Sequence, residues 1–389
     1  MKKIFTTIGI TALILVWLGL TAAAWFGTPE EMSVSERRKL AQAPKLSIET
    51  LLAEDDYRAD GTIRKKNSFM SLFEEYSLDQ FPLRDRFRQV KSIFTYYVMQ
   101  QKDNNEIYVE DGYAAKLLYP LDEDKLQANL KILNTVVQQQ IVRGKCKLYV
   151  AVVPDKGYYL AEENGYLAMD YDKLFDAVEK KFPSDKLPNA THIDLTDCLT
   201  IDSYYRTDTH WRQEQILPVA EKIAQAMGVT VEQAEDYTQV EAERPFYGVY
   251  YGHAALPMAA EPLYWMKSEL LDDCKVYDYD EKTGVWNEHS QVYNLEKLEG
   301  NDLYEVFLSG NLPLLRIDNP NAATDKELII FRDSFGSSLA PLLVKDYKTV
   351  TLVDLRLVEY KNLGQFINFN GQDVLFLYNT QVLNQALST

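Results

Sequence analysis

Only four histidines, His192, His210, His253 and His289, could supply an imidazole base in this chain of 389 residues. His210 lies in the stretch Asp-Thr-His-Trp, two residues after Asp208. A spacing of two suits a loop or a short extended segment, and it keeps the two side chains close together. In such a pair the carboxylate can orient the imidazole and stabilise its charged form, so the stretch could be the acid-base half of a catalytic site.

A serine at a second place in the sequence offers the nucleophile that this pair would need. In IIFRDSFG, Ser334 stands where an apolar, strand-like run ends and a helix begins, and Gly336 would allow a tight turn. That position exposes a hydroxyl at the carboxyl edge of a parallel sheet, where α/β proteins place their sites. Backbone N–H groups at the start of the helix could hold a developing oxyanion. We expect Ser334 to attack, His210 to take its proton and Asp208 to orient His210.

Both motifs also have structural explanations, which the residues alone leave open. Asp208 and Thr209 are good N-cap residues for a following helix, and short Asp-Ser patterns are common at turns. Arg332, Arg356 and Asn379 fall near the ends of predicted strands. They could bind substrate or assist the oxyanion, and ordinary ion pairs and loop caps are the alternative.

Composition excludes several other classes of function. No HExxH, paired-histidine, GxGxxG or GxxxxGK[ST] pattern occurs, so we predict neither a metal site nor a cofactor. Cys146, Cys198 and Cys274 lie far apart and form no CxxC, which favours free thiols over a disulfide framework. The formal charge of -17 argues against a nucleic-acid partner, because phosphate binding needs clustered Lys and Arg.

The N-terminus predicts a membrane anchor over residues 1–26. Lys2 and Lys3 precede an uncharged, mostly apolar segment from Ile4 to Phe26, which is long enough to cross a bilayer at about 1.5 Å per residue. The two lysines should stay cytoplasmic and send the rest of the chain outside the cell. Ala22 to Ala24 could instead be a cleavage site that releases a secreted protein, but the apolar segment exceeds the roughly 7 to 15 residues of a secretory signal.

The remaining chain divides into two predicted regions. Residues 27–105 read as a polar tether followed by two helices that break at Pro82. Residues 106–389 read as alternating helices and strands with an α/β fold, in which the runs KLYVAVVP, KELIIFRDS, KTVTLVDLR and QDVLFLYNT are buried strands. The helix after the Asp-Thr-His-Trp stretch should be kinked at Pro218. Residues 235–320 form a predicted β-rich insertion with a hairpin turning near Lys282 to Gly284.

Several stretches in the same order resemble a known family. RTDTHW, GNLPLLRIDNP and IIFRDSFGSSLAPLL resemble the DHHW proteins of Gram-positive bacteria. More distantly, they are similar to the alginate O-acetyltransferases J and X. Further counterparts are SERRKLAQAPKLS, DQFPLR, VVPDK and FYGVYYG. The resemblance implies an SGNH-hydrolase-like three-layer sandwich with a mainly parallel sheet. It also implies a dyad of Asp208 and His210 with Ser334 as nucleophile, whereas Thr209 departs from the family, which has a histidine there.

The resemblance further implies an extracytoplasmic O-acyltransferase, with acetyl as the expected group, that modifies a cell-surface or secreted polysaccharide through an acyl-serine. A multi-spanning membrane acyltransferase would be the partner that supplies the acyl group. A carbohydrate esterase differs only in that water attacks the acyl-enzyme. A non-catalytic scaffold or glycan-binding subunit of a polysaccharide export complex is the alternative from another class.

Overall fold

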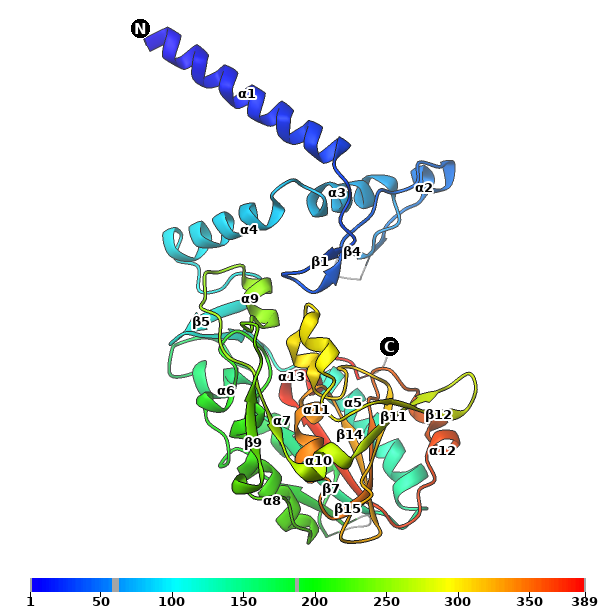
Figure 1. The fold of residues 1–389 in the computed structure, drawn as a ribbon. Helices are drawn as coiled ribbons and strands as arrows, with labels where there is room; N and C mark the ends of the chain where they lie inside the picture. Colours follow the sequence, from blue (N-terminus) through cyan, green and yellow to red (C-terminus); the bar gives the residue numbers. More distant parts are fainter. Residues whose placement is uncertain (1, 58–62, 186–188, 388–389) are drawn as a thin grey trace. The chain divides into compact units, whose positions relative to one another are not determined.

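The computed structural model describes residues 2–57, 63–185 and 189–387. The chain separates into two compact units, Met1–Gln101 with Ala255–Pro257, and Lys102–Ala254 with Met258–Thr389 (Figure 1). Each unit is built differently. The first consists of helices and short hairpins, and the second is organised around one large sheet.

In the first unit, two amphipathic helices follow the N-terminal segment. The helices are α1 (Lys2–Phe26), α2 (Ile48–Leu52), α3 (Phe69–Asp79) and α4 (Arg84–Ile93), with a π-helical turn η1 (Phe94–Val98) after α4. The strand pairs are β1 (Met32–Ser33) with β2 (Arg38–Lys39), and β3 (Asp56–Tyr57) with β4 (Ile63–Lys65). The predicted pair of helices on either side of Pro82 is confirmed. α1 includes Thr6–Ala24, a segment long and apolar enough to cross a membrane, a property that an N-terminal signal sequence shares.

The second unit contains an eight-stranded sheet in the order β12-β11-β13-β15-β14-β16-β7-β8. Its strands are β7 (Lys147–Val153), β8 (Ala190–Ile193), β11 (Lys275–Asp280), β12 (Val285–Ser290), β13 (Leu314–Asp318), β14 (Lys326–Arg332), β15 (Tyr347–Val353) and β16 (Asp373–Asn379). The five strands from β15 to β8 pair in parallel, and β13, β11 and β12 extend the sheet in antiparallel fashion. The predicted α/β fold with a mainly parallel sheet is therefore confirmed.

Helices cover both faces of this sheet and make three layers. Along β16, Leu375 and Leu377 face one core with residues of α8 (Leu217–Met227), whereas Val374 and Phe376 face the other. The second core contains residues of α5 (Glu123–Val136) and α7 (Tyr171–Lys181). Both faces of β16 are buried, which explains why its sequence is a continuous apolar run and does not alternate.

Smaller elements complete the second unit. They are β5 (Ile107–Glu110) paired with β6 (Tyr113–Lys116), β9 (Thr238–Glu241) paired with β10 (Tyr264–Lys267), α6 (Lys156–Leu160), α9 (Val249–Ala254), α10 (Glu269–Asp273), α11 (Phe335–Leu339), α12 (Leu363–Phe366) and α13 (Thr380–Leu383), and the short turns η2 (Val137–Ile141), η3 (Ile201–Ser203), η4 (Gln213–Gln215), η5 (Ala234–Asp236), η6 (Leu295–Glu299), η7 (Leu303–Val306), η8 (Ala340–Leu343) and η9 (Tyr360–Asn362).

Two details differ from the sequence predictions or refine them. The predicted kink at Pro218 is wrong, because α8 begins at Leu217 and Pro218 lies in its first turn, where a missing N–H costs nothing. The predicted hairpin is confirmed as β11 and β12, with the turn between Asp280 and Val285. These two strands join the edge of the main sheet through β13, so part of the predicted β-rich insertion belongs to that sheet.

Candidate active site

Ser334 lies directly after β14, at the turn into α11. Asp333 fixes this turn, because its Oδ1 accepts the Phe335 N–H at 3.0 Å and its Oδ2 accepts the Asn379 N–H at 2.6 Å from the end of β16. Asp333 is fully buried, and burial raises the pKa of its carboxyl group. The parallel pairing of β14 with β16 thus holds Ser334 at the carboxyl edge of the sheet.

Gly336 is required here by packing. A Cβ at this position would lie 2.7 Å from the Cβ of Arg332, and the backbone has no positive φ that would demand a glycine. The tight turn that the sequence suggested is therefore a close approach between α11 and the end of β14. Any larger residue would push Ser334 and its turn away from the strand.

The loop that carries Asp208 and His210 is closed on itself by backbone contacts. Tyr204 and Trp211 form an isolated antiparallel bridge, and the Tyr205 N–H donates to the His210 carbonyl at 3.0 Å. The loop is a folded-back extended segment, as the spacing of two residues between Asp208 and His210 predicted.

Ser334, His210 and Asp208 meet in the arrangement of a serine triad. His210 Nε2 lies 2.7 Å from Ser334 Oγ, and His210 Nδ1 lies 2.5 Å from Asp208 Oδ1. The Asp208 side chain is fully buried, whereas the imidazole keeps 12% of its surface exposed. With Nδ1 protonated toward the carboxylate, Nε2 is free to accept the serine proton.

Asp208 also caps a helix, but not the one that follows it in sequence. The next α-helix, α8, begins only at Leu217, so the alternative that Asp208 caps a directly following helix does not hold. Instead, Asp208 Oδ2 accepts the N–H of Val249, the first residue of α9, at 2.8 Å. Gly248 makes this contact possible, since a Cβ there would lie 2.2 Å from the Cβ of Asp208.

Two aromatic residues set the plane and position of the His210 ring. Tyr304, from η7, stacks on the imidazole with ring centroids 3.8 Å apart and an interplanar angle of 8°. The Trp211 indole N–H donates to Ser338 Oγ at 2.8 Å, and the Tyr304 hydroxyl contacts the same oxygen at 2.8 Å. Ser338 in α11 thus joins the histidine loop to the helix of the nucleophile. Sequence analysis missed Tyr304, because nothing in its local sequence distinguishes it from other core aromatics.

Arg332, Arg356 and Asn379 make ion pairs and hydrogen bonds near the carboxyl ends of the strands. Arg356 makes a bidentate contact with Asp354, at 2.8 and 2.6 Å. Arg332 is fully buried, and its Nη1 lies 4.0 Å from Asp354 Oδ2. Asn379 is buried and donates from Nδ2 to the Val153 carbonyl at 3.1 Å. These are the ion pairs and caps that the sequence left open as the alternative to substrate contacts.

The N–H groups at the start of α11 are mostly engaged. Asp333 accepts from Phe335 through its side chain and from Gly336 through its carbonyl, at 3.0 and 3.1 Å. The amide of Ser334 itself makes no hydrogen bond to the described part of the chain. Of the predicted oxyanion donors, the Ser334 amide is therefore the one that a substrate could use.

Lys156, from the VVPDK stretch, lies buried behind the histidine loop. Its Nζ donates to the carbonyls of Tyr205 and Arg206, at 2.9 and 3.3 Å, just before Asp208. Burial lowers the pKa of Lys156 to about 7, although the nearby charges of Asp208, Glu261 and Asp155 oppose that shift.

Thr209 faces a second polar pair beside the dyad. The hydroxyl of Tyr250 lies 3.0 Å from Thr209 Oγ1 and 2.9 Å from Gln381 Oε1. Thr209 is partly exposed, unlike Asp208 before it. The residue that departs from the family pattern therefore lies at the edge of the site, where it leaves the contact between Asp208 and His210 intact.

Among residues 2–57, 63–185 and 189–387, no group of three or more His, Cys, Asp or Glu residues could hold a metal ion. Cys146, Cys198 and Cys274 are free thiols.

Comparisons with known proteins agree with this architecture. Residues 113–282 match the family model described as SGNH hydrolase-like domain, acetyltransferase AlgX. That match contains Asp208 and His210 and ends before Ser334, so the serine is assigned by geometry. No curated protein matches the sequence significantly.

Solved structures share the fold at low sequence identity. Bacillus cereus PatB1 with a sulfonyl adduct has a TM-score of 0.55 and 19% identity, over 72% of this chain and 96% of that chain. A DHHW family protein from Eubacterium siraeum has a TM-score of 0.56 and 21% identity, over 73% of this chain and 93% of that chain. The resemblance predicted from the motifs is confirmed: the chain carries an SGNH hydrolase-like domain similar to that of acetyltransferase AlgX, in a fold that it shares with a DHHW family protein.

Proposed function

We propose that this chain is an extracytoplasmic O-acyltransferase that transfers an acyl group, in the first place acetyl, to a hydroxyl of a cell-surface or secreted polysaccharide. The observation that carries the proposal is the 2.7 Å contact between His210 Nε2 and Ser334 Oγ, backed by Asp208. The match of residues 113–282 to an acetyltransferase domain supports acyl transfer over other serine chemistry.

The reaction proceeds in two half-reactions. Ser334 Oγ attacks the carbonyl carbon of the acyl donor while His210 Nε2 takes the hydroxyl proton, and Asp208 stabilises the resulting imidazolium. The tetrahedral oxyanion collapses, the donor's leaving oxygen departs with the proton from His210, and the acyl group remains on Ser334. A sugar hydroxyl then attacks the acyl-serine, gives its proton to His210 and takes the acyl group, and Ser334 recovers its proton.

The position of the oxyanion is constrained by the donors that remain available. The Phe335 and Gly336 amides are occupied by Asp333, which leaves the Ser334 amide as a donor from the nucleophile's own turn. A well-placed oxyanion donor typically contributes about 10²–10³ in rate. Asp333 acts as a positioning residue, because it holds the turn without touching the reacting atoms.

The proposed compartment follows from α1. A membrane-spanning α1 with Lys2 and Lys3 on the cytoplasmic side would keep the second unit outside the cell and close to the bilayer. A multi-spanning membrane acyltransferase is the proposed source of the acyl group, because an extracytoplasmic enzyme needs a donor that has crossed the membrane. We assign residues 1–26 to the anchor, residues 27–105 to the tether and its helices, and residues 106–389 to the catalytic domain.

A chromogenic acetyl ester tests the site directly. The purified chain is expected to hydrolyse the ester slowly, and Ser334→Ala or His210→Ala should reduce the rate by at least about 10³-fold. Mass spectrometry after rapid acid quenching should find an acetyl group on the peptide that contains Ser334. Wild-type rates in both variants would exclude the triad and leave the non-catalytic scaffold or glycan-binding subunit as the function.

A sulfonyl fluoride provides a second, independent measure. Bacillus cereus PatB1 is known with a sulfonyl adduct, and sulfonyl electrophiles react with activated serines. Ser334 should be sulfonylated in the wild-type chain and much more slowly in His210→Ala. Esterase and transferase are then separated by adding a polysaccharide acceptor, since only a transferase produces an O-acylated glycan in preference to free acid.

A further inference from the structure

A row of exposed apolar side chains runs along α4 and into η1. Leu83, Phe87, Val90 and Phe94 are 67%, 49%, 66% and 54% exposed. The spacing of three and four residues puts Phe87, Val90 and Phe94 on one face of a helix that turns by 100° per residue, and Leu83 is the N-cap residue before that helix. We refer to these four residues as the apolar stripe. Contiguous exposed apolar side chains of this kind often mark a surface that binds another protein or a membrane.

Cations border the apolar stripe on both sides. Helical geometry places Arg86 and Lys91 roughly 70° to either side of its centre, and both side chains are exposed. Arg84 and Arg88 lie further round α4, about 90° and 130° from that centre, and they pair with Glu36 at 2.5 and 3.1 Å. One face of the helix is thus bound to its own unit, and the other presents apolar side chains between two positive charges.

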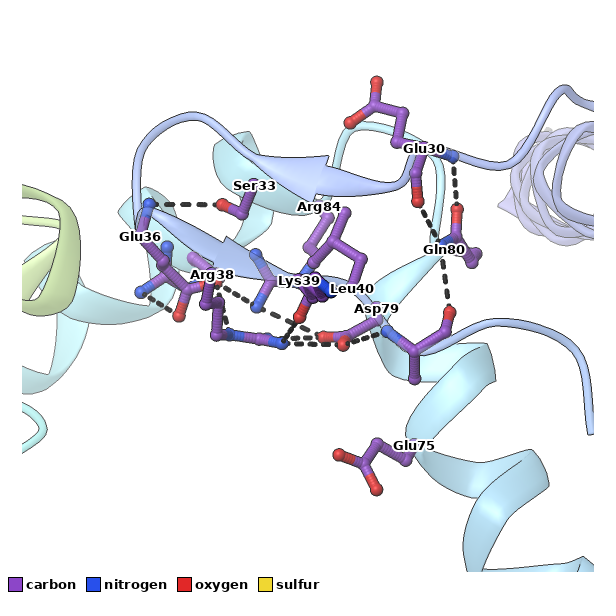
Figure 2. Close-up of polar contacts among 12 residues, drawn as sticks. Glu30, Ser33, Glu36, Arg38, Lys39, Leu40, Glu75, Asp79, Gln80 and Arg84 are labelled. Atoms are coloured by element: carbon purple, nitrogen blue, oxygen red, sulfur yellow. Dashed lines mark hydrogen bonds and ion pairs between the residues drawn. The ribbon is translucent and has the colours of Figure 1, made fainter. Parts of the chain in front are cut away.

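A network of ion pairs and hydrogen bonds fixes the end of α3 and, through Arg84, the start of α4 to the segment that follows α1 (Figure 2). Asp79 accepts two hydrogen bonds from Arg38, at 2.8 and 2.6 Å, and one from the Ala41 N–H at 2.9 Å. Gln80 accepts the Glu30 N–H at 2.9 Å and donates to the Glu30 carbonyl at 2.8 Å. These contacts join SERRKLAQAPKLS to DQFPLR, two stretches for which the proposed chemistry has no use.

The network places α4 within reach of the membrane surface. Glu30 follows Phe26, the last residue of α1, by four residues, which span at most about 14 Å. α1 contains the segment Thr6–Ala24 that could cross a bilayer. Amphipathic helices on a bilayer bury their apolar face about 5–10 Å into the headgroup region, so the hydrogen-bonded Glu30 and Gln80 hold α4 at a suitable height.

The distribution of charge along the chain also favours contact between this segment and an anionic membrane. Residues 27–101 hold twelve acidic and twelve basic side chains, although the whole chain has a formal charge of -17. The acidity of the protein therefore lies outside this segment. Anionic lipids, which would repel the rest of the chain, attract juxtamembrane cations by about 1 kcal/mol each.

We propose that α4 and η1 form an interfacial helix that lies on the anionic membrane surface beside α1, with the apolar stripe in the headgroup region and Arg86 and Lys91 on lipid phosphates. The proposal rests on the membrane anchor of the proposed function. This helix gives the first unit a second contact with the bilayer. Two contacts fix the orientation of the unit at the membrane surface, whereas α1 alone would leave the unit free to rotate.

Site-directed spin labelling of the full chain in vesicles tests this inference. Val90→Cys labels the apolar stripe, and Asp85→Cys on the other side of α4 is the matched control. Both are made with Cys198→Ser, because Cys146 and Cys274 are buried. In vesicles with anionic lipid, the label at 90 should collide more with oxygen and less with a water-soluble nickel chelate than the label at 85 does.

Two further variants identify the forces. Phe87→Glu in the Val90→Cys chain is expected to return the label to water. Arg86→Gln with Lys91→Gln should lower the surface-bound fraction on anionic vesicles by up to about 30-fold, since each cation contributes about fivefold. The same pair of changes should have little effect on vesicles of neutral lipid.

Other outcomes would overturn the proposal. Equal nickel accessibility at 90 and 85 would mean that the stripe stays in water. Shielding of the label at 90 from both oxygen and nickel would mean that protein covers it, either a second copy or another part of the chain. If the chain did not float with vesicles, the anchor itself would be wrong, whereas a failure of acyl transfer would appear only in the ester assay.

Discussion

Two aspartates in different units of the molecule have similar hydrogen bonds and different proposed roles. Asp79 in the first unit binds Arg38 and accepts the Ala41 N–H, and Asp208 in the second unit binds His210 and accepts the Val249 N–H. Arginine stays protonated, so the Asp79 pair can only hold two segments together. The imidazole of histidine can both accept and release a proton, so the Asp208 pair can hold a loop and is also suited to the proton transfer that we propose.

The surroundings of the two pairs differ accordingly. The Arg38 side chain is 40% exposed, and its charge is solvated. Asp208 is fully buried, with the His210 ring against Tyr304 and a direct contact from Nε2 to Ser334. A carboxylate becomes useful for chemistry here because its basic partner has a second nitrogen directed at a nucleophile. The carboxylate itself is held in the same way in both units.

Replacing each aspartate by asparagine separates the two uses and has the largest expected effect. Asp208→Asn should lower ester hydrolysis by about 10³–10⁴-fold, because the amide favours the wrong histidine tautomer. Asp79→Asn should leave hydrolysis unchanged. Initial rates of both variants measure this contrast, with circular dichroism spectra to show that each is folded.

Equal losses in the two variants would contradict the comparison. They would mean that the Asp79 network in the first unit controls the active site, although the contacts that hold the triad come from the second unit. Near wild-type hydrolysis in Asp208→Asn would instead remove this carboxylate from the reaction and leave it only the role of holding α9.

Sequence alone predicted the place of the candidate site in the second unit better than it predicted the residues that hold the site together. The buried runs of β7, β14 and β16 identified a parallel sheet, and the edge of that sheet identified Ser334. The partners of Asp208 could not be predicted in the same way. Val249 lies 41 residues after Asp208, and Tyr304 lies 94 residues after His210, so only tertiary packing brings them to the loop.

The first unit shows the same limit. Its two helices and their break at Pro82 follow from helical spacing. The role of Arg38 and Asp79 could not be predicted from that spacing, because a charged residue in a polar segment is expected to face solvent until its partner is known. Long-range pairs between charged residues carry no local signal, and this is why the network was missed.

Gly248→Ala tests the packing that holds Asp208, with the next largest effect. Its Cβ would lie 2.2 Å from the Cβ of Asp208, so the loop or α9 has to move. We expect a loss of stability of about 1–3 kcal/mol, as for other overpacked sites, together with a fall in hydrolysis of at least tenfold. Thermal unfolding and initial rates measure the two effects.

Gly364→Ala is the matched control in the same unit. A Cβ there meets the end of the Gln140 side chain at 3.3 Å, which can move aside, and the residue lies in α12. Alanine in a helix is expected to be neutral or slightly stabilising. Similar losses in the two glycine variants would show that the close approach to Asp208 is not the cause.

Lys156 predicts a pH dependence of stability in the second unit. Burial lowers its pKa to about 7, well below the value of about 10.4 in an unfolded chain. Between these values the unfolded chain binds the proton and the folded chain does not, so this group makes stability rise as pH rises from about 7 toward 10. Lys156→Met should lose that rise.

Denaturant unfolding of both chains at pH 7 and pH 9, in the same detergent, measures the difference. From pH 7 to pH 9, the free energy of unfolding should increase more in the wild-type chain than in Lys156→Met. An identical pH dependence in the two chains would mean that Lys156 remains charged in the folded state, stabilised by Asp208, Glu261 and Asp155 against burial.

The smallest expected effect concerns acidification of the first unit. Hydrogen bonds from Arg38 are the main cause that lowers the pKa of Asp79 below its usual range. Its stabilising contribution is therefore complete above the unfolded value of about 3.9 and is lost as pH falls through the lower folded value. Pairs with an exposed arginine usually contribute about 1 kcal/mol or less, so the loosening should be local.

The Ala41 amide reports this loosening, because it donates to Asp79, whereas the Leu40 amide donates to the Glu31 carbonyl and serves as the reference. Hydrogen exchange at Ala41, corrected for the intrinsic effect of pH, should accelerate below about pH 4 in the wild-type chain. In Asp79→Asn it should be fast at every pH and show no such step. A step that persisted in Asp79→Asn would assign the pH dependence to another carboxylate of the network, such as Glu36, which pairs with Arg38 and Arg84. The network would then depend less on Asp79 than its hydrogen bonds suggest.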